Sequence, residues 1–535
     1  MNYKTIFKWL PTSLIVATFT TTLISGLTGL WIAEILGTVA SFNQSNTQKD
    51  IRGFAIFIFG GLLIFFANNA LLKWTRAQAV KLLNQRLKTE FLTYSIRKNH
   101  FSETLSSNKK YSMLVDDFRL ITINYFTLFF DIIGYFVMSV FATAYLLYLN
   151  LPIGSLFAIS SFFAMLPPWI WGSFLEKRAK NWTDSNAHFI QSARDLFSGL
   201  LTIKTYQAEK TVFENNLQRL KKSENDLQKL NFGQILISII AEAASVIGEM
   251  LPFAFALFFV LAGSIEAGAI IAMHYARDRV AFPLRFAAQQ ISQMKTTSGI
   301  RKEIEQMLKE NAEYVEPEII KIEKPRIKID ELSFSYGEQE PLININKLII
   351  PYGEKILITG DSGSGKTTLL DLIQGFLEPL TGSIRCSNQR ANIDNNTGLF
   401  ARIHQDPFIF HNTLKFNLTL GKEYSDEACL EVLRQVNLLD ELGIDCLTKS
   451  YGENGSDLSG GQKQRVEIAR ALLHEKQILL VDEATSALDK KAARKVRDVL
   501  WNLPGTVIEI AHHYDLDELE RFSIEHYHLI NQNLI

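Results

Sequence analysis

The sequence predicts a chain of two parts, an α-helical membrane domain with six spans and a following α/β domain. Two observations predict this division. Apolar residues crowd into long runs before Gln290, whereas the rest of the 535-residue chain has the mixed composition of a soluble protein. In that second part, apolar β-branched segments alternate with helix-like segments, which is typical of α/β domains. We expect the membrane domain at 1–305, a linker at 306–325 and the α/β domain at 326–535.

Six runs are candidate membrane spans, because a span needs roughly 20 mostly apolar residues. The sixth run is the weakest, since charged residues lie in its middle. The first run is longer than the apolar core of about 7–15 residues in a signal peptide, so we expect it to stay as a membrane helix. In chain order the runs are 13–38, 53–75, 123–148, 152–173, 234–263 and 266–292.

Lysine and arginine predict the orientation, since loops on the cytoplasmic side carry an excess of them. The segments after the second and fourth spans are rich in both, whereas the loops after the first, third and fifth spans hold only Lys49 and Arg52. Both basic segments, both termini and the α/β domain are therefore predicted to face the cytoplasm. That arrangement requires an even number of spans, which is why the sixth is included.

The two basic segments also have apolar residues at three- and four-residue spacing, at 81–98 and 214–230. This spacing predicts helices. We expect them to continue the neighbouring membrane helices; the alternative is two amphipathic helices lying on the membrane surface. The charged stretch 301–325 predicts a further helix followed by a linker.

Composition argues against some classes of function. A formal net charge of -1 argues against a nucleic-acid-binding protein, which normally carries a basic face, so no nucleic-acid partner is expected. Cys386, Cys429 and Cys446 match no metal-ligand spacing. We expect them to be ordinary thiols in a reducing compartment.

A phosphate-binding loop follows the strand predicted at 355–359 and opens a helix. Its pattern is a glycine, four residues and then Gly365, Lys366 and Thr367, in the strand–loop–helix setting that this motif requires. Glycines let backbone N–H groups approach phosphates, and the helix N-terminus adds a favourable dipole. Lys366 would reach the β- and γ-phosphates, and Thr367 would hold Mg²⁺. The predicted nucleotide-binding residues here are Gly360, Asp361, Ser362, Gly363, Ser364, Gly365, Lys366, Thr367 and Thr368.

Two adjacent acids end a second apolar strand, predicted at 477–481. Asp482 is placed to coordinate Mg²⁺ near the phosphate loop. The neighbouring Glu483 could then polarise an attacking water. The alternative for such a pair, taken by itself, is two solvated carboxylates at the end of a strand.

The segment between these motifs resembles the signature of ABC ATPases: it begins at Leu458, continues with Ser459, Gly460, Gly461 and Gln462, and then opens a helix. The resemblance implies roles for further residues in the family's order. Tyr336 resembles the aromatic residue that stacks on adenine, and Gln405 the glutamine that links Mg²⁺ to the membrane domain. Ser486–Asp489 resembles the loop that communicates across a dimer. His512 resembles the histidine that contacts the γ-phosphate, with His513 as the neighbouring candidate.

The resemblance implies a half-transporter of the exporter type, that is, a six-span membrane domain followed by an ABC ATPase domain of the phosphate-loop class. Its cofactors would be ATP and Mg²⁺, with Glu483, His512 and Gln405 as catalytic residues, and Thr367, Gln405 and Asp482 at the metal. In this family the signature of one domain completes the ATP site of another, so the resemblance implies a dimer with a second half-transporter, of the same or a different chain. ATP hydrolysis would drive alternating access and export.

The cargo stays open at this point: a peptide, a lipid, a drug or a small thiol would each fit. An importer on the exporter fold and an ATP-dependent regulator or channel are the alternatives. The lipid bilayer is an expected partner, and the resemblance implies a multi-pass protein of a bacterial plasma membrane.

Charged residues in the sixth run raise a further question, because each charge at a helix centre costs about 2.5–3.5 kcal/mol on insertion scales. One interpretation is a hydrophilic pathway for a charged or peptidic cargo. The other is internal pairing, for instance of Asp278 with His274, together with snorkelling by Arg285. The charged residues are His274, Arg277, Asp278, Arg279 and Arg285, with Glu242 and Glu249 on one face of the fifth span.

Overall fold

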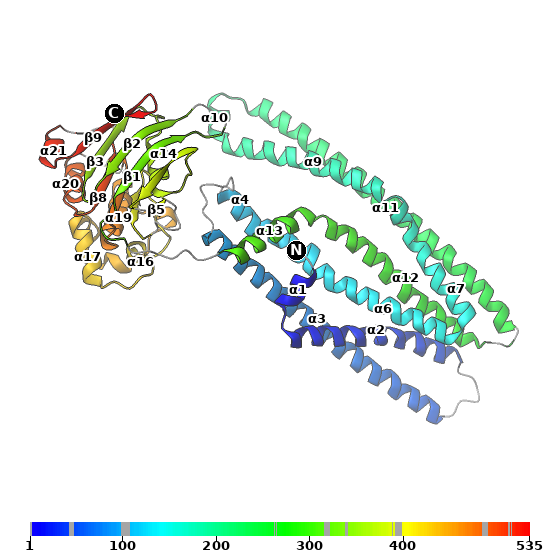
Figure 1. Cartoon of the computed structure of the whole chain (residues 1–535). Helices are drawn as coiled ribbons and strands as arrows, with labels where there is room; N and C mark the ends of the chain where they lie inside the picture. The colour runs from blue at the N-terminus through cyan, green and yellow to red at the C-terminus, as the bar shows by residue number, and fades with distance from the viewer. Residues whose placement is uncertain are drawn as a thin grey trace. The chain divides into compact units, whose positions relative to one another are not determined.

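The computed structural model divides the chain into two compact units (Figure 1). One is helical and is formed by Met1–Ser95 and Ser107–Glu313, and the other combines strands with helices and includes Tyr314–Ile535. The domain boundaries predicted above, at 305 and 326, stay predictions. The structure describes residues 3–41, 48–97, 107–261, 263, 265–314, 322–337, 341–387, 389–390, 398–483, 490–511, 514 and 516–535.

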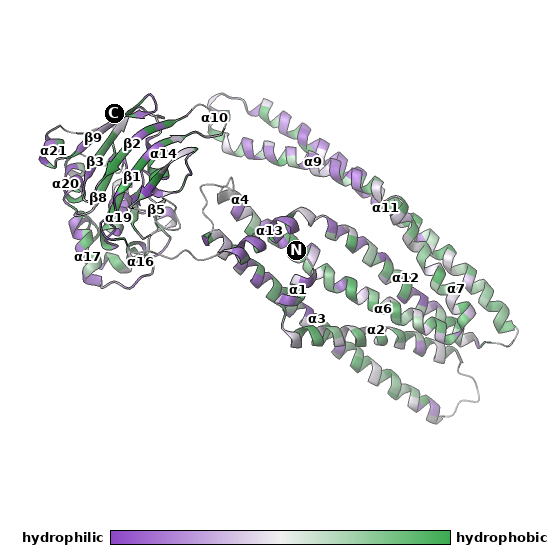
Figure 2. Cartoon of the chain, in the orientation of Figure 1, coloured by the Kyte–Doolittle hydropathy of each residue, from purple (hydrophilic) through white to green (hydrophobic). Residues whose placement is uncertain are grey.

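Long helices dominate the helical unit. In chain order they are α2 (Thr12–Ser41), α3 (Gln48–Arg97), α6 (Leu128–Leu149), α9 (Gly172–Ser198), α11 (Glu209–Leu261), α12 (Ala267–Lys295) and α13 (Ser298–Glu313). The shorter helices are α1 (Tyr3–Trp9), α4 (Ser107–Ser112), α5 (Phe118–Ile121), α7 (Leu151–Ser161), α8 (Leu166–Ile170) and α10 (Leu200–Thr205). Figure 2 shows apolar residues along α2, α6 and α7 and hydrophilic residues along α9.

The helices of this unit pack in two groups of neighbours. Helix α12 packs against α6 and α2, and α9 runs along α11 (Figure 1). Polar contacts join α3 to its neighbours: Asn68 donates to the carbonyl of Thr21 at 3.1 Å, and Arg76 pairs with Asp131 at 2.9 Å. Such contacts are expected between membrane helices, because a polar group in hydrocarbon needs a partner within the protein.

Four helical stretches among the described residues are long and apolar enough to cross a membrane: Thr12–Ala40, Asp50–Arg97, Lys110–Leu149 and Glu209–Leu261. The predicted sixth span is observed as helix α12, but its charged residues keep it outside this group. The count of six spans therefore stays a prediction.

The predicted fourth span, 152–173, is not one helix. It is divided into α7, a 3₁₀ turn at Phe162–Met165, the short helix α8 and a new helix that begins at Gly172. Pro167 and Pro168 lie in this region, and each lacks a backbone donor and disfavours continuation of the preceding turn. The predicted helical extensions at 81–98 and 214–230 agree with the structure as far as Arg97 and Leu230, because α3 and α11 are continuous helices of 50 and 53 residues.

Two sheets organise the second unit. An antiparallel sheet has the order β2-β1-β4-β5, and a six-stranded sheet has the order β10-β9-β3-β8-β7-β6. Strands β9, β3, β8, β7 and β6 of the larger sheet are parallel, and β10 is antiparallel to β9. The strands are β1 (Ile327–Phe334), β2 (Ile343–Ile350), β3 (Lys355–Gly360), β4 (Thr381–Cys386), β5 (Gln389–Arg390), β6 (Phe400–Ile403), β7 (Ile478–Asp482), β8 (Thr506–Ile510), β9 (Glu525–Ile530) and β10 (Asn533–Leu534).

The apolar strands β3, β7 and β8 are buried along their length, as expected for parallel strands covered on both faces. One apolar core joins the two sheets to α14, and a second surrounds α16, α17 and α19. The helices are α14 (Lys366–Gln374), α16 (Leu414–Thr419), α17 (Asp426–Gln435), α18 (Leu439–Leu442), α19 (Gly460–Leu473), α20 (Lys490–Trp501) and α21 (Leu516–Arg521). The carboxyl ends of β3 and β7 thereby lie beside the start of α14, where the predicted nucleotide site is built.

Candidate nucleotide site

The predicted phosphate loop connects β3 to α14, as the sequence motif requires. Gly360 has φ +153° and Gly365 has φ +99°, both in the region that favours glycine. A β-carbon on Gly360 would come within 2.6 Å of the Leu529 carbonyl oxygen. Glycine at these positions therefore allows the tight loop that leads into the N-terminus of α14.

Lys366 points back into this loop. Its Nζ donates to the carbonyl oxygens of Gly360 at 2.9 Å and Asp361 at 2.8 Å, and the residue is 6% exposed. The buried Oγ of Ser364 has no hydrogen-bond partner among the described residues. A buried amine and a buried hydroxyl in a glycine-rich loop fit the phosphate oxygens of a nucleotide.

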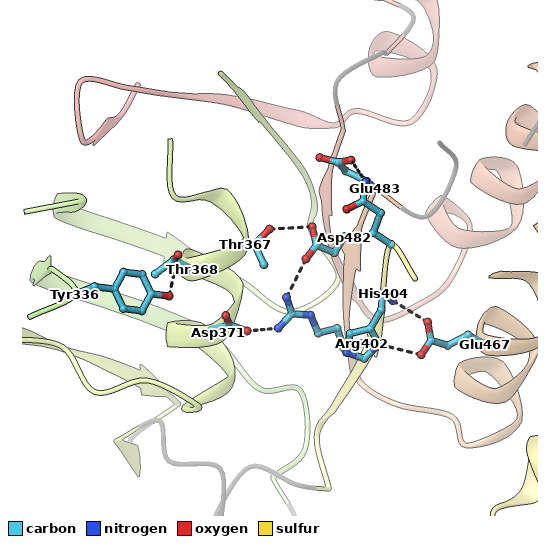
Figure 3. Close-up of polar contacts among 10 residues, drawn as sticks. Tyr336, Thr367, Thr368, Asp371, Arg402, His404, Glu467, Asp482 and Glu483 are labelled. Atoms are coloured by element: carbon cyan, nitrogen blue, oxygen red, sulfur yellow. Dashed lines mark hydrogen bonds and ion pairs between the residues drawn. The ribbon is translucent and has the colours of Figure 1, made fainter. Parts of the chain in front are cut away.

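Thr367 and Asp482 face each other across the site. The Thr367 hydroxyl donates to Oδ1 of Asp482 at 3.3 Å (Figure 3). Protein sites for Mg²⁺ use one or two carboxylates with substrate phosphates, and oxygen ligands are preferred. The hydroxyl and the carboxylate therefore fit Mg²⁺, although their role as ligands stays a prediction.

Arg402 on β6 holds the other oxygen of Asp482. Its guanidinium donates to Oδ2 of Asp482 at 2.8 Å and also pairs with Asp371 of α14 (Figure 3). Burial raises the pKa of Asp371, although the ion pair with Arg402 acts in the opposite direction. Sequence reasoning missed Arg402 and Asp371. An arginine inside the short apolar strand FARI was the available signal, because a buried cation requires an acidic partner.

Glu483 and Gln405 are brought together. The Nε2 of Gln405 donates to Oε2 of Glu483 at 2.9 Å. Glu483 has φ +52°, which is uncommon for a residue with a side chain, and its N–H donates to the carbonyl of Ile510 at 3.0 Å. This turn at the end of β7 directs the second acid away from the strand. The predicted role of Gln405 at the metal stays a prediction.

The predicted signature residues form the N-terminus of α19. Ser459 caps the helix in a reciprocal arrangement with Gln462, in which each side chain accepts from the other residue's backbone N–H. Arg465 makes two hydrogen bonds to Glu441, at 2.6 and 2.9 Å, and this contact lowers the pKa of Glu441. Ser459 and Gly460 are exposed. Among the described residues, no hydrogen bond or ion pair joins the signature to the phosphate loop of the same chain.

Helix α19 also contacts the segment after β6 that carries Gln405. Glu467 accepts from the His404 N–H at 2.7 Å and lies 2.9 Å from its Nδ1, and Gln464 donates to the Gln405 carbonyl at 3.3 Å. Hydrogen bonds therefore connect the segment of Gln405 to α19, the helix that begins at the signature. Sequence reasoning missed this link as well.

Tyr336, predicted to stack on adenine, lies beside α14. Its hydroxyl is 3.3 Å from Oγ1 of Thr368, and the ring packs edge-on against Phe334. The residue is 51% exposed, which leaves a ring face accessible next to the phosphate loop. His512, His513 and Ser486–Asp489 lie outside the described residues.

The three cysteines are buried free thiols, and burial raises the pKa of Cys386 to about 11. High thiol pKa values disfavour both metal binding and nucleophilic chemistry, which need the thiolate. Among the residues that the structure describes, no group of three histidine, cysteine or acidic side chains has the arrangement of a metal site.

Comparisons with known proteins agree with this architecture. The family model of the ABC transporter transmembrane region matches residues 12–275, and that of the ABC transporter matches 343–486. The heterocyst differentiation ATP-binding protein HepA of Nostoc sp. is 32% identical over 346 residues, which cover 61% of this chain and 55% of the relative. The ATP-dependent lipid A-core flippase of Saccharophagus degradans is 30% identical over 349 residues, which cover 61% of this chain and 58% of the relative. These matches span little more than half of each relative's length.

A solved structure shares the fold across both units. It is described as a bacterial Atm1-family ABC exporter with ATP bound, and it superposes with a TM-score of 0.77 at 19% identity, covering 98% of this chain and 94% of the other. Two family models in the expected order, together with this fold, identify both parts of the molecule. The chain belongs to the ABC transporter family, as an exporter-type half-transporter in which a helical transmembrane region precedes an ATP-binding domain.

Proposed function

We propose that this chain hydrolyses ATP to export a cargo across a membrane, as one half of a dimer. The observation that carries the proposal is the meeting of four motif residues at the start of α14 and just after or at the ends of β6 and β7. Thr367 contacts Asp482 at 3.3 Å, and Gln405 contacts Glu483 at 2.9 Å. A hydroxyl and a carboxylate for the metal thereby lie next to a carboxylate and an amide for the attacking water.

In the proposed reaction Lys366, Ser364 and the loop N–H groups bind the phosphates of ATP, and Tyr336 stacks on the adenine. Thr367 and Asp482, with Gln405, would hold Mg²⁺, which when bound neutralises charge on the phosphates. Glu483 accepts the proton of the attacking water, and Gln405 orients that carboxylate through its amide. The proposal gives His512 the contact with the γ-phosphate.

The exposed signature supports dimerisation. Ser459 and Gly460 present the N-terminus of α19 to solvent, and such an end binds phosphate readily. A second half-transporter, of the same or another chain, would supply its own signature to this chain's phosphate loop. Two composite ATP sites would result, and their closing and reopening would drive alternating access in the membrane helices.

The proposed setting is a bacterial plasma membrane, with the ATP-binding domain in the cytoplasm. The basic segments after the second and fourth predicted spans support this orientation, because cytoplasmic loops carry excess lysine and arginine. Export rather than import is favoured by the exporter fold that the chain shares. Transport into inside-out vesicles measures the direction, since ATP on the outside drives uptake only if the pump exports.

The first experiment measures ATP hydrolysis by the full chain in lipid nanodiscs. Glu483→Gln is expected to lower turnover by about 100-fold or more, in line with loss of a general base. Glu423→Gln serves as the matched control, because Glu423 is an exposed acid of the same domain, outside the site. Equal turnover in wild type and Glu483→Gln would contradict the catalytic assignment. Turnover that appears only after a second chain is added would assign the partner to a different protein.

A further inference from the structure

A cavity of about 450 Å³ lies among α6, α11 and α12 of the helical unit. Its volume falls in the range of about 300–1,000 Å³ that small-molecule sites occupy. The wall is partly apolar, with Met138, Val246, Tyr275 and Phe282, and partly charged. The charged residues of the lining are Glu242, Arg277, Asp278, Arg279 and Arg285.

Arg277 builds the cavity from within the protein. The residue is 1% exposed, and its guanidinium donates to the carbonyl and the hydroxyl of Ser245 on α11, at 2.6 and 3.0 Å. It also pairs with Asp278 at 3.1 Å, and the pairing of Asp278 with His274 that one interpretation of the sequence proposed stays a prediction. Arg277 therefore fixes α12 against α11 and pairs with Asp278, one of the two acids in the lining.

Arg279 and Arg285 supply the positive charge that is left over. Among the described residues of the lining, three arginines face two carboxylates, an excess of one positive charge, and Glu242 is the acid left after Asp278 pairs with Arg277. Arg279 is half-buried and lies beside Gly29 of α2: a β-carbon added to Gly29 would lie 4.0 Å from the Arg279 side chain. The guanidinium of Arg285 lies 5.5 Å from the ring centre of Phe282, within cation–π range.

The exposed residues of α12 mark the open side of this cavity. Tyr275, Asp278 and Phe282 are exposed and follow one another at spacings of three and four residues, which places them on one face of the helix. Charged groups on a lipid-facing surface would be strongly unfavourable, so this face belongs to a wet space. An arginine fork at its edge binds carboxylate or phosphate with two parallel hydrogen bonds.

We propose that this cavity binds the anionic group, a phosphate or a carboxylate, of an amphiphilic cargo, with Arg279 and Arg285 on the charge and Tyr275, Phe282 and Met138 on the apolar part. The inference rests on the proposed transport function and names the substrate class of that function. A cargo that is entirely apolar would leave the excess guanidinium unpaired, and a strongly cationic cargo would meet like charge.

The test measures binding without ATP, using the full chain in phosphatidylcholine nanodiscs. The probes are two pairs, each with and without the anionic group: fluorescent phosphatidic acid against fluorescent diacylglycerol, and an N-acylated dipeptide with a free carboxylate against its amide. The anionic member of at least one pair is expected to bind about tenfold more tightly. Preference within the lipid pair assigns the phosphate of a lipid, and preference within the dipeptide pair assigns a soluble carboxylate. Equal binding within both pairs overturns the proposal.

Variants place the preference in this cavity. The double change Arg279→Gln with Arg285→Gln is expected to abolish it, whereas Arg194→Gln, on an exposed face of α9, keeps it. Arg279→Lys with Arg285→Lys retains the charge and should keep part of the preference. Glu242→Gln removes the opposing acid and should strengthen binding of the anionic probe, a gain that misfolding cannot produce. A preference that survives the double glutamine change places the site elsewhere and overturns the proposal.

ATP hydrolysis by the same samples separates the two proposals. If the chain hydrolyses ATP but binds both members of each probe pair equally, the cavity assignment is wrong and the proposed transport function still stands. A charge preference that requires Arg279 and Arg285, in a chain that hydrolyses no ATP with any partner, would contradict the pump and leave the binding site.

Discussion

Arg402 is a single residue on which the acidic centre of the nucleotide site depends. It separates Asp371 of α14 from Asp482 of β7, which would otherwise lie near each other as two poorly solvated acids. The arginine is 7% exposed in its side chain. With one oxygen of Asp482 held by Arg402 and the other accepting from Thr367, the carboxylate has little freedom to turn away from the metal position.

Replacing Arg402 by methionine is expected to destabilise the ATP-binding domain by about 3–5 kcal/mol, because the change leaves buried acids without their cation. The concentration of Mg²⁺ that half-saturates ATP hydrolysis should also rise, since Asp482 is no longer held in place. Thermal unfolding and a magnesium titration of turnover measure the two effects.

Two further variants serve as controls for that experiment. Arg402→Lys keeps the charge but loses the fork, so an intermediate result is expected. Arg385→Met changes an exposed arginine on β4 and should leave both readouts unchanged. An unaltered magnesium requirement in Arg402→Met, at full stability, would show that Asp482 needs no such support.

Between elements, strand β8 and helix α20 are joined by a buried ion pair. Glu509 of β8 is 0% exposed, and its Oε1 accepts from Nε of Arg497 at 3.1 Å. Arg497 also lies 3.6 Å from Glu518 of α21. Burial raises the pKa of Glu509, and Arg497 opposes that rise. The strand that leads to His512 is thereby attached to the helix that follows the segment of Ser486–Asp489.

Removing the cation of this pair should make stability depend on pH. A raised pKa means that the folded protein holds a proton which the unfolded chain releases, so stability falls as pH rises from the ordinary glutamic acid value of ~4.3 towards the folded value. Arg497→Met is expected to raise the pKa of Glu509 further and to extend this loss upwards in pH. Its destabilisation should reach about 3–5 kcal/mol above that range.

Unfolding temperatures measured across mildly acidic to mildly alkaline pH check this prediction. The paired change Arg497→Met with Glu509→Gln removes both charges of this pair and leaves Glu518 with Arg494, which lies 3.7 Å away. It should recover most of the stability and flatten the pH profile. A flat profile in Arg497→Met alone would mean that Glu509 has another cationic partner.

The sequence predicted elements well where a local pattern determines them. Lys366, Thr367 and Asp482 lie in short motifs whose strand and helix context is readable, and α3 and α11 are continuous as their spacing indicated. The fold class is confirmed by the family models and the shared fold. The fourth span was wrong as a single helix, because hydropathy averages over Pro167 and Pro168. Arg402 was missed because its two partners come from elements that only the folded sheet brings together.

At the scale of the whole molecule, the proposed dimer predicts a particular pattern of complementation. A chain with Lys366→Ala lacks a working phosphate loop, and a chain with Ser459→Arg lacks a working signature. Each alone should be nearly inactive. A mixed dimer would contain one site with both defects and one intact site, so co-expression should restore hydrolysis well above either variant alone. Failure to restore activity in isolated mixed dimers would show that each site is completed within one chain.

Helix α11 has a mechanical consequence. Its 53 residues extend over roughly 80 Å at about 1.5 Å per residue, whereas a hydrocarbon core is about 30 Å thick. About 50 Å of stiff shaft therefore projects beyond any bilayer that its apolar end crosses, braced by α9 along its side. A tilt of only about 5° at the apolar end displaces the far tip by roughly 4 Å. Because the proline of α11, Pro252, lies within the apolar end, the polar shaft has no built-in hinge and acts as a lever that amplifies small rotations.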